Sequence, residues 1–281
     1  MDSWLVAAAL TSALLHASWH AVVKSSSHTG EAMTAQMVGS ALLALPALAV
    51  TGLPTLDSVP WMIGSTLLSI AAVSALLRGY ARGGFGVVYP VTRASSVLIV
   101  LPLAAAIAGE WPAPRALAGV ALVSCAVLML AFTARAGSVG ALTRPALGWA
   151  LLAATCTAGY IVCDAQGVRK SASPLSYGLA VGVINGVVWG WMQHRGGMRL
   201  GAIAARMWPK ALALAVAATV SYLLILWVWM HAPIALGSAL RDTSAIFATL
   251  IALVILKEPF DWRVLLAVAL ATAGSILIRL G

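Results

Sequence analysis

The feature that most constrains this chain is a succession of apolar runs, separated by short segments that hold most of its charges and helix breakers. Each run is about 20 residues long, and a helix of that length spans the roughly 30 Å hydrocarbon core of a bilayer. Backbone groups in that core must be hydrogen-bonded within the protein, which a helix achieves by itself. The pattern therefore predicts an all-α membrane protein.

Ten such runs can be placed along the chain, with breakers such as Gly52-Leu53-Pro54 between them. They are predicted at residues 4–23, 32–52, 59–78, 86–109, 115–133, 146–165, 174–194, 209–231, 235–256 and 262–280. Ten spans use about 200 residues, so the chain 1–281 is expected to form a single membrane domain. No basic segment precedes the first run, which is therefore expected to be a retained helix rather than a cleaved signal.

Composition excludes several classes of function. Only 9% of the residues are charged, against roughly 25% in soluble domains. The net charge of +9 comes from basic residues scattered at the ends of apolar runs, so no nucleic-acid partner is expected. The three cysteines lie inside apolar runs without ligand spacing, and no phosphate-binding loop or hydrolase motif occurs, so we expect no metal, no cofactor, no catalytic residue and no enzyme.

An internal repeat is carried by the sparse charges. One shift of 148 residues superposes Arg93 on Arg241 and Glu110 on Glu258, together with the arginine five residues after each glutamate. The shift predicts two halves of five helices, and because five is odd, the halves must cross the membrane in opposite directions. Inverted repeats hold a solute between them in many transporters. The two predicted repeats are residues 1–135 and 144–281.

Orientation follows from the distribution of lysine and arginine. The loops after the odd-numbered predicted spans hold eleven basic residues, and the other side, with both tails, holds four. The positive-inside rule places the richer side in the cytoplasm. Both termini of this multi-pass protein are therefore predicted to lie outside the cytoplasm, in a bacterial-type inner membrane.

At this point the chain resembles the drug/metabolite transporter superfamily, in its EamA-like branch of amino-acid and metabolite exporters. The resemblance rests on the two five-helix halves, a glutamate that ends the fourth helix of each, and Trp19 ahead of Lys24 at the close of the first helix. The segment 15–21, LHASWHA, also resembles a subgroup associated with phosphonate use. Relatives usually keep both termini in the cytoplasm, which the charge distribution here opposes.

Polar and aromatic residues inside the spans are candidates for the wall of a solute cavity, since ionisable groups are expensive in a bilayer unless they face a cavity or a partner. His16 and His20 lie four apart on one helix face, and a histidine can take up a proton near neutral pH. Asp164 is a carboxylate for a solute amine, a proton site, or a helix end capped by Arg169 or Lys170. The predicted cavity residues are His16, Trp19, His20, Tyr89, Tyr160, Asp164, Asn185, Trp189 and Tyr222.

Arg93 and Arg241 lie one or two turns into their predicted helices. Under the inverted repeat they are expected toward opposite membrane faces, as a pair of gates that each contact the anionic end of a solute. The alternative is that they reach the nearer interface, with Arg241 steadied by Asp242.

The seventh predicted helix has a glycine at every fourth position: Gly178, Gly182, Gly186 and Gly190. A face without side chains permits close helix packing, either within the chain or across a homodimer.

These features favour a secondary transporter for amino acids or similar zwitterionic metabolites, which works by alternating access between two inverted halves. The partners implied are a small solute, the lipid bilayer and a coupled proton. The alternatives are a permease for phosphonates or other organic anions, which is favoured if the two arginines line the cavity and Asp164 does not, or efflux of drugs or cations. An intramembrane enzyme would rest on His16, His20 and Asp164.

Overall fold

The structure is a computed structural model, which describes residues 1–24, 26, 28–82, 85–133, 143–171, 173–244, 246–247, 250–251 and 262–280. The described residues form helices and connecting turns, with no strand among them. The first half contains α1 Ser3–Lys24, α2 Thr29–Thr51, the short 3₁₀ helix η1 Leu56–Ser58, α3 Val59–Tyr80, α4 Phe85–Ala108 and α5 Pro114–Thr133. The second half contains α6 Arg144–Lys170, α7 Pro174–Arg195, α8 Leu200–His231, α9 Ile234–Asp242 and α11 Trp262–Leu280.

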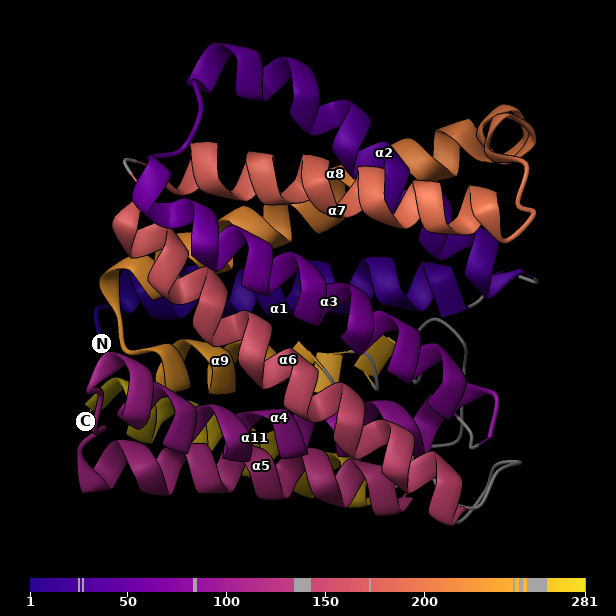
Figure 1. Ribbon diagram of the computed structural model, residues 1–281. Helices are drawn as coiled ribbons and strands as arrows, with labels where there is room; N and C mark the ends of the chain where they lie inside the picture. Colours follow the sequence, from indigo (N-terminus) through magenta and orange to yellow (C-terminus); the bar gives the residue numbers. More distant parts are fainter. Residues whose placement is uncertain are drawn as a thin grey trace.

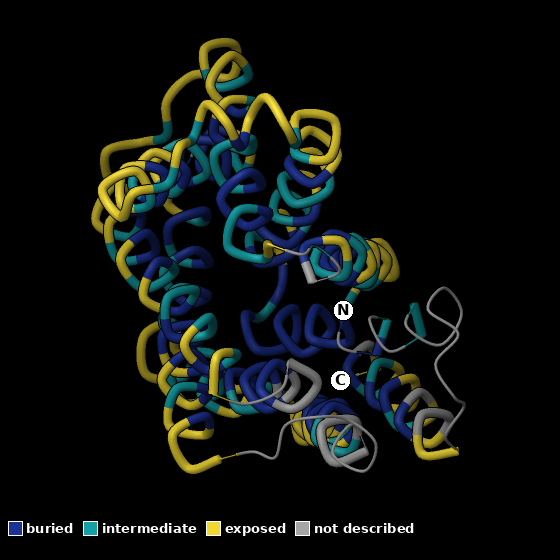
Figure 2. Tube along the Cα trace, turned by 90° about the vertical axis from the view of Figure 1, so that its right-hand side faces the viewer, coloured by how far each residue is buried: buried dark blue, intermediate teal, exposed yellow. Residues whose placement is uncertain are grey.

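Length and composition mark this bundle as a multi-pass membrane protein. Seven of the described helices are long and apolar enough to cross a bilayer, and α5 and α11 contain shorter apolar stretches. Large apolar side chains stand exposed around the bundle, such as Val50, Leu42 and Leu67. In Figure 2 exposed residues ring the outside of the helices and buried residues face inward. A surface of that kind suits lipid, which needs no polar groups from the protein.

The helices pack as a bundle in which partners come from both halves of the chain (Figure 1). The main contacts pair α3 with α6, α5 with α11, α2 with α7, and α1 with α8, and α6 also packs on α4. The largest buried cluster contains residues of α1, α3, α4, α5, α6, α7, α8, α9 and α11, with Trp229, Tyr177 and Ile225 fully buried. The two halves therefore share one core.

The bundle has two distinct ends. We call the end that holds the start of α1 and the finish of α11 the terminal face (Figure 1), and the opposite end the basic face. On the basic face the Thr143 hydroxyl donates to the carbonyl of Arg82 (3.0 Å), and Arg206 forms an ion pair with Glu31. On the terminal face the Thr55 hydroxyl donates to the carbonyl of Lys170 (2.6 Å).

The helix bounds differ from those predicted at two places. α8 begins at Leu200, nine residues before the predicted start at Pro209, which lies within the helix. A proline there removes one backbone hydrogen bond and does not end the helix. α6 continues to Lys170, five residues beyond its predicted end. The ninth predicted span lies only partly within the described residues, and Glu258 of the predicted repeat lies outside them.

One prediction concerns the crossing of α5 and α11. A Cβ at Gly119 would lie 2.6 Å from the carbonyl oxygen of Gly274, and a Cβ at Gly274 would lie 2.7 Å from that of Gly119. Because both contacts are to backbone, Gly119→Ala and Gly274→Ala must push the helices apart. We expect each variant to lower the melting temperature of the purified protein in detergent by several degrees, a loss of about 1–3 kcal/mol.

The matched control is Gly148→Ala, because a Cβ at Gly148 meets no atom within 4 Å. Melting is monitored by tryptophan fluorescence. Equal melting temperatures for all three variants would contradict the close crossing of α5 and α11.

Candidate functional site

A cavity of about 220 Å³ lies inside the bundle and is lined by residues of α1, α2, α3, α4, α6, α7, α8 and α9. Its size is below the usual range for drug-sized ligands, so it suits a small solute. Ten of the predicted cavity and gate residues line it, namely His16, Trp19, His20, Tyr89, Arg93, Tyr160, Asp164, Asn185, Tyr222 and Arg241.

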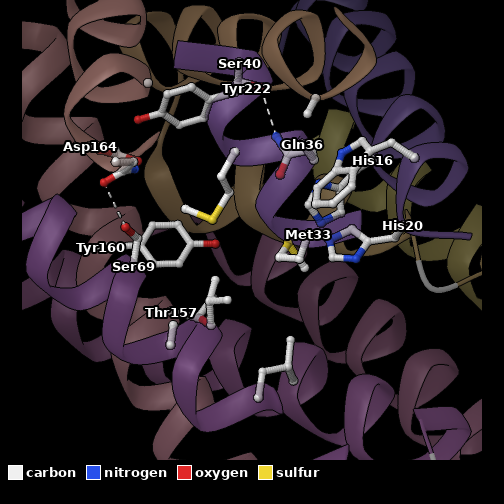
Figure 3. A pocket seen from close by; sticks show the side chains of 18 of the residues that line it. His16, His20, Met33, Gln36, Ser40, Ser69, Thr157, Tyr160, Asp164 and Tyr222 are labelled. Carbon is white, nitrogen blue, oxygen red and sulfur yellow. Dashed lines mark hydrogen bonds between the residues drawn. The ribbon is translucent and has the colours of Figure 1, made fainter. Parts of the chain in front are cut away.

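One wall is an aromatic cluster on the last turns of α1. The rings of Trp19 and His20 stack with centroids 3.7 Å apart, and His16 meets both rings edge-on at 5.1 and 4.4 Å. The ring of Tyr89, from α4, lies 5.5 Å from that of His20. The four-residue spacing on α1 places the two imidazoles on one face, as Figure 3 shows on one side of the cavity.

The two arginines lie on the wall of the same cavity. Both are only 5% exposed, so neither side chain reaches an interface. The expectation that Asp242 steadies its neighbour Arg241 is corrected, because Asp242 forms its ion pair with Arg93. Adjacent residues on a helix do not face one another, which leaves Asp242 free to meet α4 across the bundle.

Arg241 forms no ion pair among the described residues, and its guanidinium carbon lies 5.8 Å from the centre of the Trp229 ring. Its Nε atom is buried without a hydrogen-bond acceptor in the described part of the chain. Both arginines therefore line the same cavity, whereas the sequence predicted one toward each membrane face.

Asp164 is the acidic group on the opposite wall from the histidines (Figure 3). It is 1% exposed and accepts a hydrogen bond from the hydroxyl of Tyr177 at 3.2 Å. The alternative in which Arg169 caps this carboxylate does not hold, since Arg169 forms its ion pair with Glu110. Lys170 lies instead over the ring of Trp61, at 5.9 Å from the centroid.

Several uncharged polar residues complete the wall and were not singled out from the sequence. The hydroxyl of Ser69 donates to Asn185 Oδ1 (3.3 Å), and the amide of Gln36 donates to the hydroxyl of Ser40 (2.9 Å). Thr157 also lines the cavity. The only sequence signal for Gln36 is its polarity within an apolar run, and which way it faces depends on the rotation of α2.

Trp189 is the predicted cavity residue that the structure places elsewhere. Its indole is 2% exposed and its N–H donates to the hydroxyl of Thr34 on α2 at 3.2 Å. The residue next to it, Gly190, faces Val38 of α2. This side of α7 is therefore packed against α2, and the tryptophan serves that packing.

The glycines of α7 are used within the chain. A Cβ at Gly186 would lie 2.5 Å from the carbonyl oxygen of Met37 on α2, and one at Gly178 would lie 2.6 Å from Leu223 and Leu226 on α8. Gly178, Gly182 and Gly186 also border the cavity. The glycine face thus joins α7 to α2 and α8 and opens part of its length to the cavity.

The terminal face is closed by a polar network between the halves. Glu110 follows α4, and its carboxylate accepts from Arg169 Nη1 (2.5 Å) and from the backbone N–H of Ile234 (2.6 Å). Arg169 also donates to the carbonyls of Trp229 and Ala232, both at 2.8 Å. The carboxylate thus meets the positive start of α9, and the guanidinium meets the negative end of α8. We call these five residues the terminal latch.

One prediction tests the latch by a double-mutant cycle. Glu110→Gln and Arg169→Gln should each lower the melting temperature in detergent. The melting temperature of the double variant should fall by clearly less than the sum of the two single losses. This difference corresponds to a coupling free energy of about 1–3 kcal/mol.

The control pair for this cycle is Glu31→Gln and Arg206→Gln on the basic face, whose ion pair is far more exposed. It should show a coupling below about 1 kcal/mol. Additive losses for the latch variants would contradict the proposed network.

The described part of the chain contains no group of three or more His, Cys, Asp or Glu residues that could hold a metal ion. What the fold and the cavity define is a multi-pass helical membrane protein with a solute-sized internal chamber that polar and apolar residues line together.

Residues 144–280 match the model of the EamA-like transporter family, which belongs to the drug/metabolite transporter superfamily. This segment, nearly half of the chain, is thus an EamA-like sequence, and the resemblance seen in the sequence is confirmed. The members of this family are transporters rather than enzymes.

No curated protein matches the chain. Among solved structures 28 chains match, and one of them, described only as "Crystal structure of protein", superposes with a TM-score of 0.75 at 15% identity. The match covers 100% of this chain and 99% of the other. The two proteins therefore share a fold along their whole length.

Proposed function

We propose that this protein is a secondary transporter for small zwitterionic metabolites of the amino-acid class. The observation that carries the proposal is the presence of two opposite charges, Arg241 and Asp164, on the wall of one cavity, each without an ion-pair partner among the described residues. A solute with a carboxylate and an ammonium group supplies both partners at once.

The energetics favour such a solute. A buried charge without a partner is unfavourable, and a hydrogen bond to a charged group contributes about 1.5–3 kcal/mol. Arg241 offers a planar fork that suits a carboxylate, and Asp164 accepts from an ammonium group. An organic anion would leave Asp164 facing a second negative charge. The presence of Asp164 on the wall therefore supports the zwitterion over the anion.

The packing supports an inverted repeat. In a two-fold arrangement α1 corresponds to α6 and α3 to α8, so the contact of α1 with α8 has its counterpart in that of α6 with α3. The pairs α2 with α7 and α5 with α11 are then each related to themselves, as expected for helices next to the axis. We accordingly propose that repeats 1–135 and 144–281 form one membrane domain of ten inverted helices.

The cavity supports alternating access between these repeats. Part of its lining comes from the final turns of α1 and the early turns of α4, which lie toward the basic face, while Gly178 and Asp164 lie nearer the terminal face. The terminal latch closes the other side. We propose that this arrangement is a state with access from the basic face, and that transport opens the terminal face in turn.

Besides tyrosines and arginines, three titratable groups line the cavity and are candidates for a coupled proton: His16, His20 and Asp164. We propose that one of them links transport to a proton gradient, because the chain contains no nucleotide-binding loop to supply energy.

The charge distribution orients the protein in the inner membrane. By their positions in the sequence, eleven basic residues belong to the basic face and four to the terminal face, so the terminal face is proposed to lie outside the cytoplasm. We expect alkaline phosphatase fused after Gly281 to be active in a bacterial host, and a green fluorescent protein at the same point to be dark. A bright fluorescent fusion with inactive phosphatase would reverse the orientation and leave the fold unchanged.

The substrate class is tested by matched ligands. A panel of amino acids is first screened for thermal stabilisation of the purified protein, and the best amino acid is then compared with its deaminated acid and its decarboxylated amine. Asp164→Asn should weaken binding of the amino acid and the amine by about 10–100-fold but spare the acid. Arg241→Gln should weaken binding of the amino acid and the acid but spare the amine.

The controls are Asp57→Asn and Arg206→Gln, which remove equivalent charges outside the cavity and should leave affinity unchanged. The side-chain amide of the Asp164→Asn variant would still accept from the Tyr177 hydroxyl, so this variant is expected to fold, and Arg241→Lys is the milder second variant. Equal losses for all three ligands in either cavity variant would contradict the assignment of the two charges.

A further inference from the structure

Gly182 differs from the other three glycines of its face. Added Cβ atoms at Gly178 and Gly186 would lie 2.6 Å or less from neighbouring atoms, and one at Gly190 would lie 3.0 Å from Val38. A Cβ at Gly182 would meet only the Cβ of Ala44, at 3.9 Å, which is an ordinary contact. Close packing therefore explains three of the glycines and does not explain Gly182.

The space beside Gly182 belongs to the cavity. Gly182 and Ala44 both line it, on α7 and α2 respectively. A side chain at position 182 would therefore extend into the chamber where α7 and α2 meet. The absence of a side chain there enlarges the room available to a solute.

Gly182 also lies at the level of Arg241 and Asp164. Counted from the helix ends on the terminal face, Asp164 is six residues into α6, Arg241 seven into α9 and Gly182 eight into α7. At a rise of about 1.5 Å per residue, the three residues lie roughly 9–12 Å from those helix ends. They are therefore at similar depths in the bundle. Arg241, 5% exposed with an Nε that has no partner among the described residues, independently indicates that this level receives a ligand.

We infer that Gly182 is a specificity-determining residue that sets the largest solute side chain the transporter accepts. This inference rests on the proposed function, in which Arg241 and Asp164 hold the carboxylate and ammonium groups. The solute's own side chain then occupies the space that a larger residue at position 182 would fill. A stepwise increase in volume at this position should exclude large solutes first.

The experiment measures binding of glycine, alanine, leucine and phenylalanine to the purified protein by isothermal titration. It compares the parent with Gly182→Ala, Gly182→Val and Gly182→Leu. One methylene in a close-fitting pocket changes affinity by about tenfold or more. We expect the largest amino acid bound by the parent to lose about tenfold in affinity with Ala or Val at position 182, and the smallest to change by less than about threefold.

Two controls separate space in the cavity from helix packing. Gly186→Ala should lower the melting temperature and weaken all bound amino acids alike, since its Cβ meets the α2 backbone. Gly201→Val should change neither the melting temperature nor the affinities, because a Cβ added at Gly201 meets no atom within 4 Å. Gly182→Ala is the variant expected to fold normally even where the larger side chains do not.

The outcomes are distinguishable. A parent protein that binds none of the amino acids would overturn the proposed function, and with it this inference. A parent that binds them, with the same size preference retained in Gly182→Ala and Gly182→Val, would leave the function in place and overturn the role of Gly182.

Discussion

The ion pair between Arg93 and Asp242 is the interaction on which the centre of this protein depends. It joins α4 of the first half to α9 of the second in the buried interior of the bundle. Breaking a buried pair by removing one partner costs about 3–5 kcal/mol, because the other charge is left in a poorly polarisable environment. The pair therefore fixes the relative position of the halves at mid-depth. It also leaves the neighbouring Arg241 as a cation of the cavity wall that has no ion-pair partner among the described residues.

The fold was largely predictable because the position of each helix follows from the pattern of apolar residues along the sequence. Apolar runs long enough to cross a bilayer located the helices to within a few residues, and only α6 and α8 extend well beyond their predicted bounds. The polar wall was also largely predictable, since ionisable residues such as Asp164 and Arg241 are tolerated in such helices only beside a cavity or a partner.

What the sequence could not supply was the rotation of each helix and the identity of each partner. Asp242 pairs across the bundle although its neighbour Arg241 carries the right charge, because consecutive helical residues point in different directions. Trp189 packs on α2 for the same reason, while Gln36 faces inward. A pattern of residue types gives the candidates, and only the assembled bundle decides which of them meet.

Two of the ion pairs between the halves differ in a way that bears on the proposed alternation. Arg93 and Asp242 are almost inaccessible, whereas Arg169 and Glu110 have side chains that are 25% and 17% exposed. Water can hydrogen-bond the partly exposed latch groups as they separate, which offsets part of the energy lost when the latch opens. Water cannot replace the partners in the buried Arg93–Asp242 pair unless it enters the core of the bundle. A motion that opens the terminal face should therefore break the latch and turn about the Arg93–Asp242 pair, which keeps Arg241 and Asp164 at one level while access changes sides.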